Sequence, residues 1–216
     1  LTVALQIKQE RPETGIIVIE RNAHPVPEAA FKVGESVLEG AASYFAETLG
    51  LKEHLETQHF FKAGLRFFTS DGDNSQIETR PEIGTVRIFE DQDTVSSFQI
   101  DRGRFENKLG EMIRTLGVTF WDGSKITDIH LNDHGNDHGQ HTVTVDHDGS
   151  AHTIAARWVI DASGRAALLR RQLGLSEEVS HHINAAWLRV NQRFNTNLWS
   201  RKLAWRRRVD SSVVRI

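Results

Sequence analysis

Residues 16–21 read IIVIER, a run of four aliphatic side chains that ends abruptly in Glu20 and Arg21. A continuous apolar run of this kind predicts a strand that is covered on both faces. The segment before it, residues 1–13, has the period of an amphipathic helix. The expected inward positions of this helix are Leu1, Ala4 and Leu5, with Lys8 as a further candidate. A helix that leads through a short turn into a buried strand is the second half of a βαβ unit.

The composition is that of an ordinary globular protein with room for one domain or one and a half. The 216 residues include 38% hydrophobic and 25% charged side chains, and the formal net charge is −3. This balance gives no basic field, so we expect neither nucleic acid nor a membrane as a partner. Cysteine is absent, which excludes disulfides, thiolate metal sites and cysteine nucleophiles and fits a reducing cytoplasm. No stretch reaches the ~20 apolar residues of a membrane span.

The rest of the chain alternates between helical and strand patterns. Helices are expected over residues 35–55, 98–117 and 164–174, and strands over residues 59–68, 79–91, 118–133, 141–149 and 150–161. Glu35 and Ser36 are expected to cap the first of these helices, and Gly50 to end it. Its inward positions are Leu38, Ala41, Ala42, Phe45 and Leu49. Those of the second helix are Phe105, Leu109, Met112, Ile113 and Leu116. The order favours an α/β fold.

Two of the predicted strands end in a carboxylate. In dinucleotide-binding α/β folds, an acid at the position of Glu20 accepts hydrogen bonds from ribose hydroxyls, because the strand end opens at the ligand crevice. Residues 157–171, RWVIDASGRAALLRR, predict a strand that ends at Asp161, a small turn and a helix. The N-terminus of that helix offers free N–H groups to a phosphate or a flavin edge, and Asp161 can accept from a ribityl or ribose hydroxyl.

Each carboxylate also has a plain structural interpretation. Glu20 is suited to a strand that simply runs out into solvent. Asp161 is suited to an Asx turn that starts a helix. The cofactor hypothesis requires both side chains to hold opposite portions of one adenine-flavin molecule, and therefore to lie on the same side of the sheet.

Several motifs together resemble the FAD-dependent monooxygenases of the hydroxylase type. They are ERN at residues 20–22, KVGES at 32–36, QIDRGRFENKL at 99–109 and VIDASGRAALLRR at 159–171. KVGES and the stretch FKAGLRF at residues 61–67 are more narrowly similar to the flavin-dependent halogenases of the tryptophan-halogenase type. The resemblance extends over about residues 1–190. It implies a Rossmann-like, three-layer FAD-binding fold interleaved with a mixed or antiparallel-sheet substrate domain.

The resemblance also assigns parts of the chain to parts of the site. The cofactor part would comprise about residues 1–60 and 99–178, and the substrate part about residues 61–98 and 179–216. Glu20 matches the ribose-binding acid, with Arg21 beside it. The loop along the flavin would hold Gly34, Glu35 and Ser36. Arg102 matches an arginine that approaches the cofactor, and Asp161 and Gly164 match the second FAD fingerprint.

Lys62 lies among aromatic residues in the predicted strand at residues 59–68. Strand alternation places Phe60, Lys62, Gly64 and Arg66 on one face and Phe61, Ala63, Leu65 and Phe67 on the other. The residues alone favour an edge strand with solvated cations. The resemblance instead implies that Lys62 is the catalytic lysine, which binds hypohalous acid or carries its halogen as a haloamine. Burial or the neighbouring Arg66 would lower the pKa of Lys62 and improve it as a nucleophile.

The expected function is that of an FAD-dependent halogenase in the cytoplasm. It would take reduced FAD from a separate flavin reductase, use a halide ion as co-substrate and act on a small aromatic substrate, free or bound to a carrier. One alternative is an FAD-dependent monooxygenase, hydroxylase or reductase without halide chemistry. Another, of a different class, is a non-catalytic remnant or binding module. The GxGxxG turn and the WxWxIP motif of the family are expected outside residues 1–216, so we expect this stretch alone to be inactive.

Two other clusters have weaker claims to a function. Residues 132–141 hold His134, His138 and His141 with Asp133 and Asp137, but the glycines among them favour a solvated turn over a metal site. The C-terminal tail carries Arg201, Lys202, Arg206, Arg207 and Arg208. These residues could meet an anionic partner such as a carrier, although a solvated face is the simpler interpretation.

Overall fold

The computed structural model describes residues 1–29, 32, 34–62, 64–70, 74–86, 97–132, 140–186, 191 and 196–207. The chain forms two compact units, and each is described by itself. Unit 1 comprises Leu1–Pro27 with Glu106–Ala186, and unit 2 comprises Glu28–Phe105 with Trp187–Ile216. The division falls within helix α4, Arg102–Thr115. None of the helices in these ranges is long and apolar enough to cross a membrane.

Unit 1 begins with the predicted helix and strand. Helix α1, Thr2–Glu10, buries Ala4, Leu5 and Lys8, as the helical period predicts. Strand β1, Ile17–Ile19, pairs in parallel with β7, Thr119–Trp121. The predicted cover on both faces of β1 is wrong for the part of the chain that the structure describes, because Ile17 is 41% exposed.

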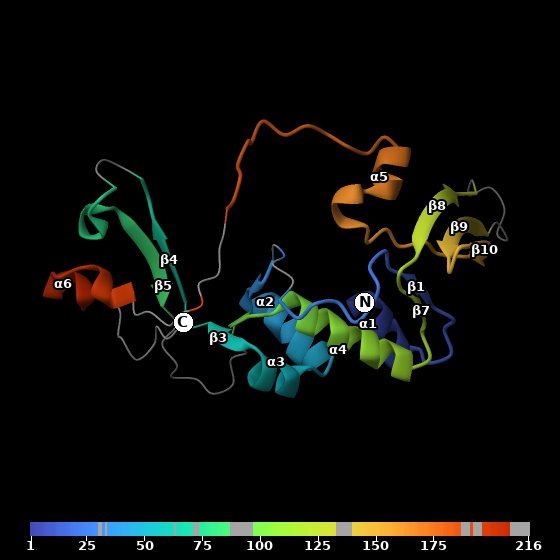
Figure 1. Ribbon diagram of the computed structural model, residues 1–216, viewed down its shortest axis with the longest axis horizontal. Helices are drawn as coiled ribbons and strands as arrows, with labels where there is room; N and C mark the ends of the chain where they lie inside the picture. Colours follow the sequence, from blue (N-terminus) through green and yellow to red (C-terminus); the bar gives the residue numbers. More distant parts are fainter. Residues whose placement is uncertain are drawn as a thin grey trace. The chain divides into compact units, whose positions relative to one another are not determined.

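The second sheet of unit 1 is antiparallel, with the order β10-β9-β8 (Figure 1). Its strands are β8, Lys125–His130, β9, His141–His147, and β10, Ser150–Ala156. Asp148 and Gly149 join β9 to β10 with φ values of 51° and 73°, as a two-residue hairpin turn of the primed kind requires. Ile129, Val143 and Val145 form the core of this sheet, and Ile19 of β1 packs against it.

The chain leaves the sheet earlier than the sequence predicts. Strand β10 ends at Ala156, so the predicted strand up to Asp161 is wrong: among the described residues no strand pairs with residues 157–163. The strand-like alternation is still present, because Val159 packs on the sheet core while Trp158 and Ile160 are exposed. The predicted helix is shorter than expected and consists of η3, Gly164–Ala166, and α5, Leu168–Gln172.

Unit 2 is built around a small antiparallel sheet with the order β2-β6-β3. Its strands are β2, Ser36–Val37, β6, Ser97–Gln99, and β3, Phe60–Lys62. Between β2 and β3 the chain forms α2, Glu39–Ser43, the π-helix η1, Tyr44–Thr48, and α3, Lys52–Gln58. The helix predicted over residues 35–55 is therefore two segments separated at Gly50, whose φ of +70° ends the first as predicted.

The start of that helix was predicted incorrectly. Ser36 and Val37 pair with Gln99 and Phe98 of β6, so Glu35 and Ser36 do not cap the helix. The N-cap is Leu38, which makes no side-chain cap hydrogen bond and is 57% exposed instead of facing inward. Glu35 and Ser36 are residue types that can cap a helix, but here the pairing of Ser36 with β6 determines the local structure instead.

A β-hairpin completes unit 2. Strand β4, Gly64–Phe68, pairs with β5, Glu82–Val86, and the 3-10 turn η2, Ile77–Thr79, lies between them in sequence. The last described elements are η4, Thr196–Trp199, and α6, Leu203–Arg206. Figure 1 shows α6 beside this hairpin, and Trp205 is only 2% exposed there. The strand predicted over residues 59–68 is thus two strands with different partners.

Helix α4 agrees closely with its prediction. It buries Phe105, Leu109 and Ile113, which are spaced four residues apart as one helical face requires. Leu116 was expected inward but is 42% exposed, because the helix ends at Thr115. The residues before α4, Ser97–Gln99, form strand β6, the central strand of the unit 2 sheet.

Candidate functional site

Lys62 is the last residue of β3 and is buried, with 7% of its surface exposed. Its Nζ donates hydrogen bonds to the carbonyl oxygen of Val37 at 2.7 Å and to Ser36 Oγ at 3.1 Å. Both acceptors belong to β2, on the far side of the central strand β6. The backbone of Lys62 is also fixed, because Ser97 Oγ donates to its carbonyl oxygen at 3.1 Å. The lysine therefore joins the two outer strands of the sheet.

The surroundings of Lys62 weaken its preference for the charged form. Burial lowers the pKa of Lys62, and the nearby carboxylate of Glu39 opposes this shift without cancelling it. Both hydrogen-bond acceptors of Nζ are uncharged. The ammonium ion therefore loses hydration without a direct ion pair to any residue that the structure describes, and a lowered pKa makes an amine a better nucleophile at neutral pH.

Arg66 does not share this environment, although the sequence places it on the same strand face as Lys62. It belongs to β4, and its Nε donates to Glu82 Oε1 at 2.5 Å. Its guanidinium carbon lies 4.7 Å from the ring centroid of Trp205 and 5.2 Å from that of Phe68. The expected separation of solvated cations from packed aromatics is reversed, since Phe61 and Phe67 of the face expected to pack are 44% and 56% exposed.

The segment predicted to lie along a flavin is next to Lys62 and close to Arg102. Ser36 binds the lysine, and the carbonyl of Glu35 accepts from the backbone N–H of Ile100 at 2.7 Å. Gly34 has φ +91°, and a Cβ at this position would lie 3.3 Å from Nη1 of Arg102. The structure therefore brings five of the predicted site residues together in unit 2: Gly34, Glu35, Ser36, Lys62 and Arg102.

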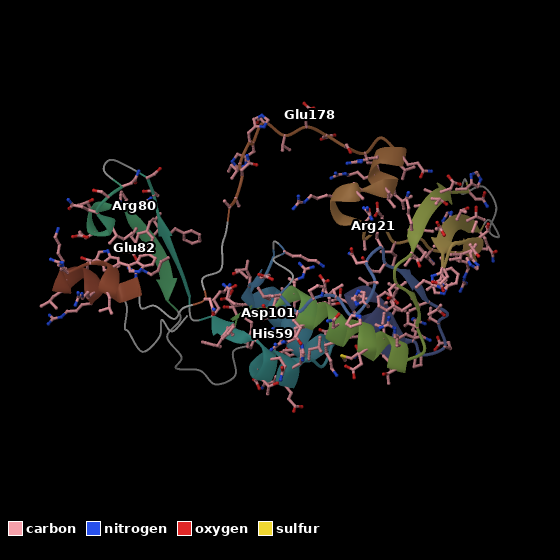
Figure 2. All side chains as sticks on the ribbon, in the orientation of Figure 1. Arg21, His59, Arg80, Glu82, Asp101 and Glu178 are labelled. Carbon is pink, nitrogen blue, oxygen red and sulfur yellow. The ribbon has the colours of Figure 1, made fainter. Side chains whose placement is uncertain are left out.

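The other predicted cofactor residues lie in unit 1. Glu20 follows β1, and its backbone N–H donates to the carbonyl of Trp121, which extends the parallel pairing by one residue. Its Oε1 accepts hydrogen bonds from the backbone N–H and the side chain of Asn22, both at 2.8 Å. Arg21 is exposed in the loop after β1 (Figure 2). A half-buried acid at a parallel strand end is the arrangement that a ribose-binding residue needs.

Asp161 organises the turn that precedes α5. Its Oδ1 accepts from the backbone N–H of Ser163 and its Oδ2 from that of Leu169, each at 2.9 Å. These contacts with Ser163 and with the helix start lower the pKa of Asp161, so it is ionised at neutral pH. Gly164 has φ +60° and is exposed, which permits a close approach of its backbone by a ligand. The Asx-turn interpretation is confirmed, and the cofactor-binding role stays a prediction.

A pair of histidines in unit 2 was not predicted from the sequence. His59 Nδ1 accepts from the backbone N–H of Asp101 at 3.2 Å, so the proton of its neutral ring is on Nε2. That Nε2 lies 3.3 Å from Nε2 of His54, which must then act as the acceptor. Burial is the main reason that the pKa of His59 is lowered to about 4, and the proximity of His54 adds to it. Figure 2 labels His59 and Asp101.

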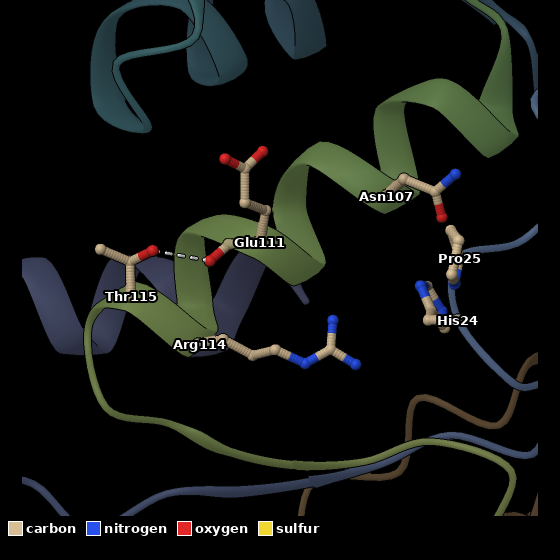
Figure 3. Close-up of a pocket in the computed structure, with 6 residues that line it drawn as sticks. All are labelled: His24, Pro25, Asn107, Glu111, Arg114 and Thr115. Atoms are coloured by element: carbon tan, nitrogen blue, oxygen red, sulfur yellow. Dashed lines mark hydrogen bonds between the residues drawn. The ribbon is translucent and has the colours of Figure 1, made fainter.

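A hollow of about 370 Å³ lies in unit 1, against helix α4 (Figure 3). Its lining consists of His24, Pro25, Asn107, Glu111, Arg114 and Thr115. None of the predicted site residues contributes to it. Arg114 is occupied by Asp122, with 2.9 Å between Nη2 and Oδ1, and by the ring of Phe120. The hydroxyl of Thr115 is likewise engaged, since it donates to the backbone carbonyl of Glu111 at 3.0 Å.

Metal-binding candidates are few. Within the ranges that the structure describes, no three His, Cys, Asp or Glu side chains are grouped as a metal site requires. His134, His138, Asp133 and Asp137 lie outside the described residues. His141 is the first residue of β9, and its Nδ1 accepts from the backbone N–H of Asn132 at 3.3 Å.

Comparison with known proteins adds one relative by sequence. No protein-family model matches the chain. Over 157 residues the chain is 29% identical to a 1H-pyrrole-2-carbonyl-(peptidyl-carrier protein) chlorinase of Pseudomonas fluorescens. The alignment covers 68% of this chain and 34% of the chlorinase, so the chain spans about a third of that relative's length.

Solved structures show the fold. A flavoprotein/dehydrogenase from Cytophaga hutchinsonii matches 84% of this chain and 41% of its own, with TM-score 0.63 and 22% identity. The myxobacterial chondrochloren halogenase CndH, an FAD-dependent halogenase, matches 76% of this chain and 35% of its own, with TM-score 0.59 and 22% identity. The predicted α/β, Rossmann-like fold of the FAD-binding class is confirmed, as is the predicted resemblance to flavin-dependent halogenases.

Proposed function

We propose that this chain, which has the fold that FAD-dependent halogenases share with other flavoproteins, carries part of the active site of such a halogenase. Reduced FAD, when bound, would supply the electrons that convert oxygen and a halide ion into hypohalous acid and water. The halogen would then replace a hydrogen on an electron-rich aromatic carbon, and the oxygen of the acid would leave as a second water. The chain's own residues would hold the cofactor and direct the oxidant.

Lys62 is the residue that we assign to the oxidant. As an ammonium ion it can donate a hydrogen bond to the oxygen of hypohalous acid. As a neutral amine it can take the halogen onto Nζ, with release of water, and pass it to the aromatic carbon in exchange for a proton. The second route needs the free amine, and the lowered pKa of Lys62 increases the fraction of that form.

A single observation carries this proposal: a lysine buried to 7% exposure is held by uncharged acceptors within the segment that resembles the flavin loop. A buried lysine that serves only stability is normally paired with a carboxylate. Lys62 has no such salt bridge among the described residues. Its amine is therefore not neutralised by a carboxylate in the part of the chain that the structure describes, unlike the guanidinium of Arg66.

The residues that would hold FAD have suitable chemistry. Glu20 offers a carboxylate at the end of a parallel strand, and Asp161 orders the turn that leads into helix α5. The absence of a side chain at Gly34 lets Nη1 of Arg102 lie close to the backbone, where the guanidinium could bind an anionic oxygen of the cofactor. Glu35 and Ser36 continue the same segment. We therefore assign Glu20, Arg21, Gly34, Glu35, Ser36, Arg102, Asp161 and Gly164 to the cofactor.

We further propose that the substrate is a small aromatic ring presented on a carrier protein. The support is the similarity to a chlorinase whose substrate is a pyrrole-2-carbonyl group on a peptidyl-carrier protein. A separate flavin reductase would supply the reduced cofactor. The assay below, run with chloride and with bromide, determines which halide is preferred.

The test is turnover by the full-length protein with reduced FAD, oxygen, and chloride or bromide, over a panel of free and carrier-bound aromatic acids. We expect halogenated product from the native protein and a loss of about 1000-fold in kcat for Lys62→Ala, the scale of a lost proton-transfer or nucleophilic group. Lys52→Ala is the matched control, because Lys52 is an exposed lysine at the start of α3.

The other functions give different outcomes in the same assay. Oxygenated instead of halogenated product would assign the protein to the monooxygenases. Absence of bindable flavin in the full-length protein would assign it to non-catalytic proteins of this fold. Halogenation that persists unchanged in Lys62→Ala would remove the lysine from the mechanism.

A further inference from the structure

We propose that Ser36 is a positioning residue for Lys62, whose hydroxyl orients the lysine Nζ for the reaction. This inference rests on the proposed function and extends it to a side chain that does not itself meet the oxidant. The two residues are 26 positions apart in the sequence and come from the outer strands of one sheet. The resemblance assigns Ser36 only to the flavin loop, so its contact with the lysine is a separate property.

The geometry around Nζ explains what the hydroxyl contributes. A lysine ammonium has three N–H donors on a freely rotating group. The carbonyl of Val37 takes one of them at 2.7 Å and Ser36 Oγ takes a second at 3.1 Å. Two fixed acceptors stop the rotation of the group, and this determines the direction of the third donor, or of the lone pair when Nζ is neutral. With Val37 alone the group could still rotate.

The two acceptors differ in what protein engineering can change. The Val37 carbonyl is backbone and persists in every variant, and its strand is paired with Phe98 of β6. Ser36 is exposed, so removal of its hydroxyl leaves no buried cavity and should not disturb the fold. Ser36 therefore offers a side chain through which the direction of Nζ can be altered while the lysine itself is kept.

Ser97 provides a control for general loosening of the sheet. Its hydroxyl also bonds Lys62, but it donates to the carbonyl oxygen at 3.1 Å and does not contact Nζ. Ser97→Ala removes a hydrogen bond to the backbone of Lys62 and leaves both contacts of Nζ in place. Ser36→Thr is the second control, because threonine retains the hydroxyl and is favoured in strands.

The first measurement needs neither flavin nor turnover. In the full-length protein, the rate at which an amine-selective acylating reagent modifies Lys62 is followed by peptide mass spectrometry across pH. A hydrogen bond to an acceptor favours the charged form of lysine, so we expect Ser36→Ala to lower the midpoint of this profile by about 0.5 to 1 pH unit. Ser36→Thr and Ser97→Ala should keep the native profile.

The second measurement is halogenation under saturating substrate. We expect kcat of Ser36→Ala to fall about tenfold with KM unchanged, since about one hydrogen bond of orientation is lost. More hypohalous acid should also escape to a trapping dye per product formed. Ser36→Thr should restore kcat and reduce the escape.

The outcomes separate this inference from the proposed function. An unchanged labelling profile in Ser36→Ala, or an equal change in Ser97→Ala, would overturn the positioning role. A shifted profile in a protein that produces no halogenated compound would retain the Ser36–Lys62 coupling while rejecting the halogenase. A native labelling profile in Ser36→Ala, found in a protein that does produce halogenated compound, would reject the Ser36–Lys62 coupling while retaining the halogenase.

Discussion

Lys62 and Arg66 lie four residues apart and are both shielded from water, yet their surroundings differ in kind. Arg66 is neutralised by Glu82 and lies against the rings of Phe68 and Trp205. Lys62 is held by a carbonyl and a hydroxyl, and burial lowers its pKa. A compensated cation stabilises a fold, whereas burial beside neutral acceptors weakens the preference of an amine for its charged form. The contrast therefore identifies which of the two is suited to chemistry.

Exchanging each cation for methionine is the most direct way to break this contrast. We expect Lys62→Met to lower halogenation about 1000-fold while thermal stability changes little. Arg66→Met should have the reverse profile, because it removes the ion pair with the largely buried Glu82 and costs about 3 kcal/mol. Steady-state kinetics and denaturant unfolding of both variants supply the comparison. Equal effects of the two substitutions on activity would remove the distinction.

The ring that covers Arg66 gives the next largest effect. Trp205→Ala removes a side chain that is 2% exposed and should lower the free energy of unfolding by about 3 kcal/mol. Trp199, which is 53% exposed, is the matched control, and its alanine variant should differ from the native protein by less than about 0.5 kcal/mol. Urea titrations of the two variants decide the matter, and similar losses would contradict the proposed packing of α6.

His59 extends the comparison to a second base whose pKa is lowered by burial. Its pKa is about 4 in the folded protein and 6.5 ordinarily, so the unfolded chain takes up the proton first as pH falls. His54 and Arg104 oppose protonation, and Asp101 favours it. The free energy of unfolding should therefore be highest above pH 6.5 and fall by about 2 kcal/mol between pH 6.5 and 4, after allowance for partial exposure.

The control for this pH dependence is His59→Gln, which cannot titrate. Melting temperatures of the native and variant proteins are compared over the same pH range, so that the other histidines cancel. The difference between the two should grow with pH and level off above about 6.5. A constant difference would show that His59 titrates in the same way in both states.

Gly34 gives the smallest effect and tests the backbone beside Ser36. Because its φ is +91°, Gly34→Ala should lower stability by about 1 kcal/mol. Gly40→Ala is the matched control, since Gly40 lies in α2 and a Cβ there would meet nothing within 4 Å. That variant should be neutral or stabilising by several tenths of a kcal/mol. Chemical denaturation distinguishes the two.

Local signals in the sequence predicted the elements whose pattern is self-contained. The four-residue spacing of Phe105, Leu109 and Ile113 gave the buried face of α4, and the apolar face of α1 was equally clear. The alternation of residues 141–149 and 150–156 gave strands β9 and β10, although the two-residue turn at Asp148-Gly149 between them was not predicted. The order of motifs gave the fold class, because several of them had to occur together.

Predictions that depended on partners distant in sequence were less successful. Nothing local divides residues 59–68 into β3 and β4, which pair with β6 and β5. Because of that division, Lys62 and Arg66 belong to different sheets. Ser36 reads as a helix cap because its competing partner, Gln99, lies 63 residues later. The contacts of Val37 and Ser97 with Lys62 follow from cross-strand register and leave no trace in composition or period.

Strand β2 contains only Ser36 and Val37, and just two residue pairs fix its alignment with β6. Neighbouring strand residues point to opposite faces, so a slip of one position would present an aliphatic group where the amine now meets a hydroxyl. The number of residues between Gly34 and Glu39 therefore determines which side chain of β2 meets the amine of Lys62. Related chains that gain or lose a single residue there should lose the amine's environment even when every motif letter is preserved.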